Sequence, residues 1–189
     1  HWVIIVFQYT VAGSAAKKNP FALIKNMLPA YTTAIGTQSS AATIPVTTQC
    51  TKNNGVSDGM AEFVCPLCAT IHLSGSTITL TSCAMAVMVM TNQSIGFGKM
   101  FPFILMLGVT MVAAPGVPGG TVMASLGLIT GVLMFDDAGT ALMLAIFALQ
   151  DSFGTACNVT GDGALTLMLT GYAEKHGIQE NQNIESPVL

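Results

Sequence analysis

Two long stretches of this chain carry no charge. No charged residue lies between Glu62 and Lys99, and none lies between Lys99 and Asp136. A helix that spans a bilayer needs about 20 apolar residues, so each stretch could hold one long element or a pair that enters and returns. Only 8% of the 189 residues are charged, whereas a soluble domain carries about 25%. The pattern predicts an all-α membrane protein.

The basic residues are all lysines, and the chain contains no arginine. This composition excludes a basic surface that binds nucleic acid. Lys17 and Lys18 follow an apolar stretch, residues 1–16, and the positive-inside rule places that end of the stretch in the cytoplasm. We therefore expect a multi-pass protein of the plasma or inner membrane.

The two ends of the chain differ in character. Residues 1–16 begin inside an apolar run with no basic region before it, so we interpret them as the end of a preceding transmembrane helix in a longer protein. Residues 174–189 are polar, and we expect them to form a cytoplasmic tail.

Two segments have the pattern of helical hairpins that enter the membrane and turn back. In residues 20–58, two apolar stretches flank a small polar sequence, with an expected tip at residues 38–40. In residues 100–135, two apolar stretches flank residues 114–121, which contain prolines and glycines. Irregular backbone at membrane depth is tolerated where it is buried in protein or lines a cavity. The sequence therefore predicts two interrupted hairpins.

Two longer apolar elements, residues 59–92 and 138–173, alternate with these hairpins. The centre of the first is polar and contains His72, and the centre of the second runs from Asp151 to Asp162. Polar centres of this kind indicate helices that are broken near the middle of the membrane, which is where transporters place their binding sites.

Asp151 and Asp162 are the most informative residues. A carboxylate at the bilayer centre is disfavoured by about 2.5 kcal/mol or more, so such residues are functional by default. Their spacing exceeds three helical turns by about 20°, which places both on one face of a helix together with Asn158 and close to Thr155. No basic residue is near in sequence, so we expect a mobile cation and a ligand's ammonium group as partners. The alternative is that each is protonated or hydrogen-bonded in a packed core.

Cys65 and Cys68 have the C-x-x-C spacing of a redox or metal site. No second pair follows, and the nearest histidine, His72, lies inside an apolar element. We favour a packing role for these thiols. A membrane enzyme that uses them stays open as an alternative.

Four short motifs resemble one known family. Residues 37–47, 66–71, 116–120 and 158–162 match, in order, the signatures of the dicarboxylate/amino acid:cation symporters, which have the glutamate-transporter fold. The resemblance implies a transport domain made of two re-entrant hairpins, a broken transmembrane helix and a final amphipathic helix. It also implies an amino-acid substrate, contact with membrane lipid, scaffold helices that this chain lacks, and a homotrimer when the protein is full length.

The resemblance further implies the residues that bind the substrate. Asp151 matches the aspartate that holds the substrate's ammonium group, and the two hairpin tips match its gates. The expected substrate-binding residues are Ser39, Ser40, Ser76, Val117, Gly119, Thr121, Asp151, Gly154, Thr155 and Asn158.

Sodium ions are the coupling ions that the resemblance implies, and no organic cofactor is expected. Asp162 and Asn158 match one sodium site, while Thr70 and the carbonyls around Ala113 match a second. The expected sodium-site residues are Cys68, Thr70, His72, Asn158 and Asp162.

Departures from the family's pattern bear on specificity and coupling. Members that carry acidic substrates have an arginine where this chain has Gly154, and the glycine is expected to leave space. Without arginine, the chain cannot bind a side-chain carboxylate through two parallel hydrogen bonds. We therefore predict sodium-coupled symport of a neutral amino acid, and the pattern is similar to that of bacterial serine/threonine symporters.

Several alternatives stay open. The family's Asn-Met-Asp-Gly-Thr reads His72–Ser76 here, which removes a carboxylate of a third sodium site and makes proton coupling through the imidazole conceivable. The same fold could carry an acidic amino acid or a dicarboxylate. A channel or receptor could bind the ligand without coupled transport, and the chain could be inactive as a fragment.

Overall fold

The computed structural model describes residues 1–178, which are helical apart from short connections and contain no strand. In chain order the helices are α1 (Trp2–Ala16), α2 (Pro20–Thr37), α3 (Ser40–Asn53), α4 (Asp58–Ile71), α5 (Ser74–Met90), α6 (Phe97–Met111), α7 (Gly120–Ala124), α8 (Leu126–Gly131) and α9 (Asp137–Lys175). The all-α architecture expected from the charge pattern is confirmed.

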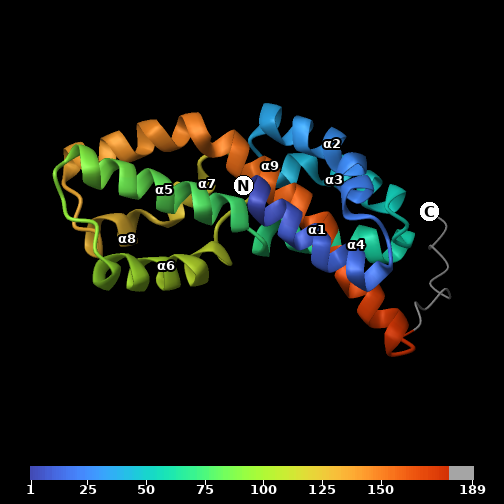
Figure 1. Ribbon diagram of the computed structural model, residues 1–189. Coiled ribbons are helices and arrows are strands. Elements are labelled where there is room, and N and C mark those ends of the chain that lie inside the picture. Colours follow the sequence, from blue (N-terminus) through green and yellow to red (C-terminus); the bar gives the residue numbers. More distant parts are fainter. Residues whose placement is uncertain (179–189) are drawn as a thin grey trace.

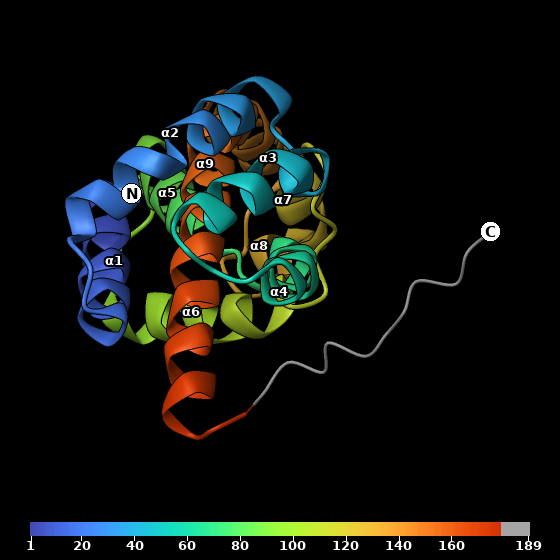
Figure 2. The ribbon, with the colours of Figure 1, turned by 90° about the vertical axis from the view of Figure 1, so that its right-hand side faces the viewer.

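Helix α9 runs the length of the molecule and packs against α1 to α5 and α8 (Figure 1). Its first half packs in a buried apolar cluster with α5 and α6, represented by Leu80, Phe103 and Phe147. Its second half packs in another cluster with α1 and α2, represented by Tyr9 and Met27. Figure 2, which looks along the molecule, shows α9 between these neighbours. The polar stretch of α9 lies where the two clusters meet, so it is covered by protein.

Residues 20–58 contain two helices, α2 and α3, joined at Gln38 and Ser39. Gln38 ends α2 in the left-handed conformation with φ 52°. The Ser39 hydroxyl oxygen then accepts a 3.1 Å hydrogen bond from the amide of Ala42 and so caps α3. The chain therefore reverses within two residues while its helix ends stay hydrogen-bonded. Entry of this pair into a membrane remains a prediction.

Residues 100–135 are less regular. Their first arm is α6, but the second arm consists of the short helices α7 and α8 rather than one helix. The interruption falls at Ser125, whose hydroxyl donates hydrogen bonds to the carbonyls of Thr121 and Val122. A serine side chain that bonds the preceding turn often bends a helix, and here it separates two.

The first of the two long elements is broken and the second is not. Between α4 and α5 the helix is interrupted at His72 and Leu73, within the polar centre of residues 59–92. The expected break in the second element was wrong, because α9 continues through Asp151 and Asp162. The polar residues there do not compete with the helix, since hydroxyls such as that of Thr160 bond the carbonyl one turn earlier.

Among residues 1–178, two helical stretches are long and apolar enough to cross a membrane, namely Asp58–Met90, which joins α4 and α5, and Asp137–Lys175, which is α9. Residues 1–16 form α1, which packs on α9 and α2 through one buried face. Of the expected tail, residues 174 and 175 belong to the last turn of α9, and residues 179–189 lie outside the described part of the chain.

Candidate functional site

A small cavity lies where the two irregular tips, the α4–α5 break and α9 come together. Its volume is about 10 Å³, which is room for about one water molecule. The residues that line it are Gln38, Ser40, Leu73, Ser76, Pro115, Gly116, Val117, Thr121, Asp151, Thr155 and Asn158. Most of the residues expected to bind substrate thus line one cavity, although they come from four separate parts of the chain.

Asp151 supplies the negative charge at this cavity. Its side chain is buried, with 4% of the residue surface exposed. Its Oδ2 accepts a 2.8 Å hydrogen bond from the amide of Gly119, at the second tip. No lysine or arginine pairs with it among residues 1–178. Gly119 therefore lies in contact with Asp151 rather than in the cavity lining.

Asn158 of α9 binds the N-terminus of α5, at the break between α4 and α5. Its Oδ1 accepts hydrogen bonds from the amides of Gly75 (2.8 Å) and Ser76 (3.2 Å), and its Nδ2 donates to the Ser76 hydroxyl (2.8 Å). The first amides of a helix have no partner within it, and Leu73, the residue before α5, provides no cap. Asn158 satisfies two of these amides from a different helix, so the break is fixed to α9 at the cavity.

Thr121 also lines the cavity, and its hydroxyl oxygen is buried without a hydrogen-bond partner. Buried polar groups are normally paired, so an unpaired hydroxyl beside a cavity indicates a position that a ligand can satisfy.

Ser39 connects the two tips. Its hydroxyl donates a 2.7 Å hydrogen bond to the carbonyl of Gly116, and the amide of Ala41 donates to the same carbonyl at 3.1 Å. The sequence motif had indicated the glycines of the second tip but not this role of the Gly116 carbonyl. A Cβ at residue 116 would lie 2.9 Å from the Ala69 carbonyl of α4, so the close approach of the second tip to α4 requires glycine there.

Gly154 does not leave space, contrary to the expectation from the sequence. A Cβ at this position would lie 2.8 Å from the Thr79 hydroxyl and 3.3 Å from the Ser76 Cα. Helix α5 therefore fills the room that an arginine side chain would need. Gly154 packs α9 against α5 and does not line the cavity.

A second polar cluster surrounds Asp162, which is 1% exposed. Asp162 Oδ1 lies 2.9 Å from His72 Nδ1, and His72 Nε2 lies 3.0 Å from Gln8 Nε2 of α1. The other carboxylate oxygen, Oδ2, has no partner. Sequence reasoning missed Gln8, although an amide within the apolar residues 1–16 was a signal that could have revealed it.

The remaining expected sodium-site residues are placed differently. Cys68 is buried on α4, whereas Thr70 is exposed and its hydroxyl donates to the Leu67 carbonyl. The structure does not give Thr70 a contact with Asp162. No group of three or more His, Cys, Asp or Glu side chains that could hold a metal occurs among the described residues. A hard cation at Asp162 would therefore depend on carbonyl, amide or hydroxyl oxygens.

The C-x-x-C motif lies buried in the helix packing. Cys65 and Cys68 are both free thiols, and the Cys65 sulfur contacts the hydroxyls of Thr51 (3.5 Å) and Thr166 (3.7 Å). These contacts join α3, α4 and α9, which is the packing role that the sequence favoured.

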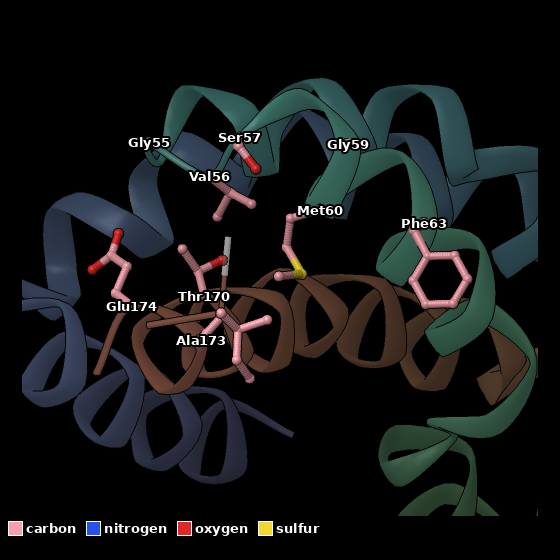
Figure 3. A pocket seen from close by; sticks show the side chains of 10 residues that line it. Gly55, Val56, Ser57, Gly59, Met60, Phe63, Thr170, Ala173 and Glu174 are labelled. Carbon is pink, nitrogen blue, oxygen red and sulfur yellow. The ribbon is translucent and has the colours of Figure 1, made fainter. Parts of the chain in front are cut away.

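An open groove of about 670 Å³ lies at the far end of α9 (Figure 3). It is lined by Gly55, Val56, Ser57, Gly59, Met60, Phe63, Thr170, Ala173, Glu174 and Ile178. In Figure 3, Met60 lies over α9 and Phe63 stands to one side. The groove shares no residue with the Asp151 cavity, and Glu174 is the ionisable member of its lining, so it is not the candidate site.

A buried carboxylate without a lysine or arginine partner, placed beside a broken helix and irregular tips, is typical of secondary transporters. Comparison with known proteins agrees with that class. The model of the sodium:dicarboxylate symporter family matches residues 1–172. The chain belongs to this family, whose members are transporters and not enzymes.

Among curated proteins, the chain is similar to amino acid transporters. It is 29% identical to human neutral amino acid transporter B(0), over 84% of this chain and 29% of that protein. It is 30% identical to human excitatory amino acid transporter 1, over 89% of this chain and 31% of that protein. It is 31% identical to bovine neutral amino acid transporter A, over 89% of this chain and 32% of that protein. The chain thus spans about a third of the length of the curated relatives it matches.

Proposed function

We propose that this chain forms the substrate- and ion-binding part of a sodium-coupled symporter for neutral amino acids. The observation that carries the proposal is the buried Asp151 carboxylate, which faces a cavity and has no basic partner among residues 1–178. An α-ammonium group is the charge that such a carboxylate would bind. The relatives named as neutral and excitatory amino acid transporters support an amino acid as the substrate class.

The cavity lining supports a neutral rather than an acidic side chain. The chain has no arginine, and no lysine lies among the described lining residues. The side-chain carboxylate of an acidic amino acid would be left unpaired there, and burying an unpaired charge is costly. The hydroxyls of Ser40, Thr121 and Thr155 instead offer hydrogen bonds to a small polar substrate. The lack of lysine and arginine at the cavity, and not space at Gly154, therefore favours a neutral substrate.

Binding requires the site to open. The present cavity holds about one water molecule, far less than an amino acid needs. The Gly119 amide occupies the Asp151 carboxylate, and the Ser39 hydroxyl bonds the Gly116 carbonyl. We infer that residues 112–119 move away from α9 and residues 38–40 to admit the substrate, whose ammonium group then replaces the Gly119 amide on Asp151.

The wider setting is also part of the proposal. The full protein would add scaffold helices, assemble as a homotrimer and lie in the plasma or inner membrane with both hairpins re-entering the bilayer. The two membrane-length stretches and the apolar side chains exposed on α1 and α6 support a lipid or scaffold environment.

Uptake by proteoliposomes tests the proposed function. Labelled serine, threonine and alanine should accumulate against their gradients when Na⁺ is high outside, and accumulation should stop when choline replaces Na⁺. Uptake of aspartate without uptake of neutral amino acids would contradict the specificity. Equilibration without accumulation would indicate a channel.

Proton coupling is the rival, because His72 contacts Asp162. It predicts accumulation that persists in choline and follows an inward proton gradient. The same vesicles, prepared with a pH gradient and no Na⁺, therefore distinguish the two coupling ions.

A further inference from the structure

The Asp162 cluster contains two buried oxygens that lack partners. They are Asp162 Oδ2 and the Gln8 amide oxygen, Oε1. Asp162 is 1% exposed and Gln8 is 9% exposed, so water outside the protein does not satisfy either atom. Buried oxygens of this kind are normally paired, and leaving two in one cluster calls for a ligand.

The hydrogen bonds of the cluster have a definite direction. The Gln8 Nε2 amide nitrogen is only a donor, so His72 Nε2, which lies 3.0 Å away, must be the acceptor. An imidazole that accepts at Nε2 carries its proton on Nδ1, and that N–H donates to Asp162 Oδ1 at 2.9 Å. Gln8 therefore sets the tautomer of His72, and His72 occupies one carboxylate oxygen and leaves the other free.

Gly161 brings these groups together on α9. A Cβ at residue 161 would lie 2.7 Å from Gln8 Oε1 and would collide with His72 Cε1. Only a glycine next to Asp162 allows both side chains to approach the helix this closely. The free Gln8 oxygen therefore lies against α9 at Gly161, the residue that precedes Asp162.

We propose that Gln8 Oε1 and Asp162 Oδ2 are ligands of a sodium ion and that His72 is a positioning residue for that site. Na⁺ is a hard cation and takes oxygen ligands. Asp162 supplies the charge, and the amide of Gln8 supplies a neutral oxygen. Both ring nitrogens of His72 are already engaged, so His72 orients the carboxylate and does not bind the ion. This inference rests on the proposed sodium-coupled function and adds α1 to its ion site.

The test is Gln8→Met in the protein that carries this chain, because methionine keeps the length of the side chain and removes its oxygen and its N–H donor. In the purified protein without substrate, we expect the Na⁺ concentration that gives half of the Na⁺-dependent rise in melting temperature to increase about tenfold. In proteoliposomes, half-saturation by Na⁺ should shift by a similar factor. A Na⁺ titration indistinguishable from that of the wild type would overturn the proposal.

Gln49→Met is the matched control, since Gln49 is an exposed glutamine of α3 and should leave both titrations unchanged. If Gln8→Met does not fold, Gln8→Asn keeps the amide but shortens its reach, and the same increase is expected. In an Asp162→Asn background, adding Gln8→Met should change the Na⁺ titration no further, because both side chains act on one ion. Additive effects would show that Gln8 acts elsewhere.

The outcomes separate the two proposals. A wild-type protein that shows neither Na⁺-dependent stabilisation nor Na⁺-dependent uptake would contradict the proposed function itself. A wild-type protein that responds to Na⁺, with a Gln8→Met variant that responds identically, would contradict only the role of Gln8.

Discussion

The amide of Gly119 donates a 2.8 Å hydrogen bond to Oδ2 of Asp151, so the second tip lies directly on the carboxylate that we propose binds the substrate. The bond joins the least regular segment of the chain to its longest helix. It satisfies one oxygen of a buried charge, which would otherwise be costly. In the proposed function, the substrate's ammonium group replaces the Gly119 amide at this carboxylate.

Asp151→Asn should weaken amino-acid binding about 10- to 100-fold, because a hydrogen bond to a charged group contributes about 1.5–3 kcal/mol and the amide carries no charge for the ammonium group. Calorimetric titration with serine or threonine in saturating Na⁺ measures the effect. Asp137→Asn, an exposed aspartate at the start of the same helix, is the control and should bind normally. Equal affinity in the two variants would exclude Asp151 from the substrate site.

Gly119→Ala should favour the open state, in which the second tip has moved away from Asp151. Gly119 has φ +70°, a conformation that costs a residue with a Cβ about 1–2 kcal/mol, although no neighbouring atom lies within 4 Å. The reaction rate of a Thr121→Cys reporter, which is buried at the cavity, with a membrane-impermeant maleimide should rise about fivefold or more. The native cysteines are all buried, which keeps the labelling background low.

Gly127→Ala, made in the same cysteine-reporter background, is the control for the labelling experiment. Like Gly119, Gly127 has no neighbour within 4 Å of an added Cβ, but its φ is not positive. Its labelling rate should match that of the reporter alone. A Gly119→Ala rate equal to that of the control would mean that the glycine conformation does not hold the tip closed.

Gly154→Ala should lower the free energy of unfolding by about 1–3 kcal/mol, because the new methyl group meets Thr79 at 2.8 Å and forces α5 and α9 apart. Chemical denaturation followed by circular dichroism measures the change. Gly108→Ala, which meets no atom within 4 Å, is the control. Thr79→Ala should partly restore the stability of Gly154→Ala, and failure to do so would place the strain elsewhere.

Asn158→Ala should destabilise the protein by about 1–3 kcal/mol, because the amides of Gly75 and Ser76 lose their acceptor in a buried position. Asn158→Asp keeps that acceptor and should lose less stability. Hydrogen exchange localises the effect, and faster exchange is expected in the first turn of α5. A uniform change across all helices would contradict the capping role.

Local pattern was enough to predict the helices and the placement of Asp151 and Asp162 on one helix. The charge-free stretches indicated apolar helices, and the spacing of Asp151 and Asp162 correctly placed them on one continuous surface of α9. The polar centre of residues 59–92 indicated the break at His72 and Leu73. These features follow from helical periodicity and from the free energy of burying polar groups, both of which are properties of neighbouring residues.

Contacts between distant segments could not be predicted in this way. The sequence suggested a break in α9 and open space at Gly154, but the glycines of that helix instead admit α5, His72 and Gln8 at close range. Whether a glycine interrupts a helix or receives a neighbour depends on what packs against it, and that neighbour lies far away in the chain.

The sequence by itself determined an all-helical chain with polar interruptions in apolar elements and two carboxylates on one helical face. Only the tertiary structure decided which groups meet those carboxylates. It placed the Gly119 amide on Asp151, and His72 with Gln8 at Asp162. The reason is physical: a helix face follows from local geometry, whereas the partner of a buried charge is selected by the packing of the whole fold.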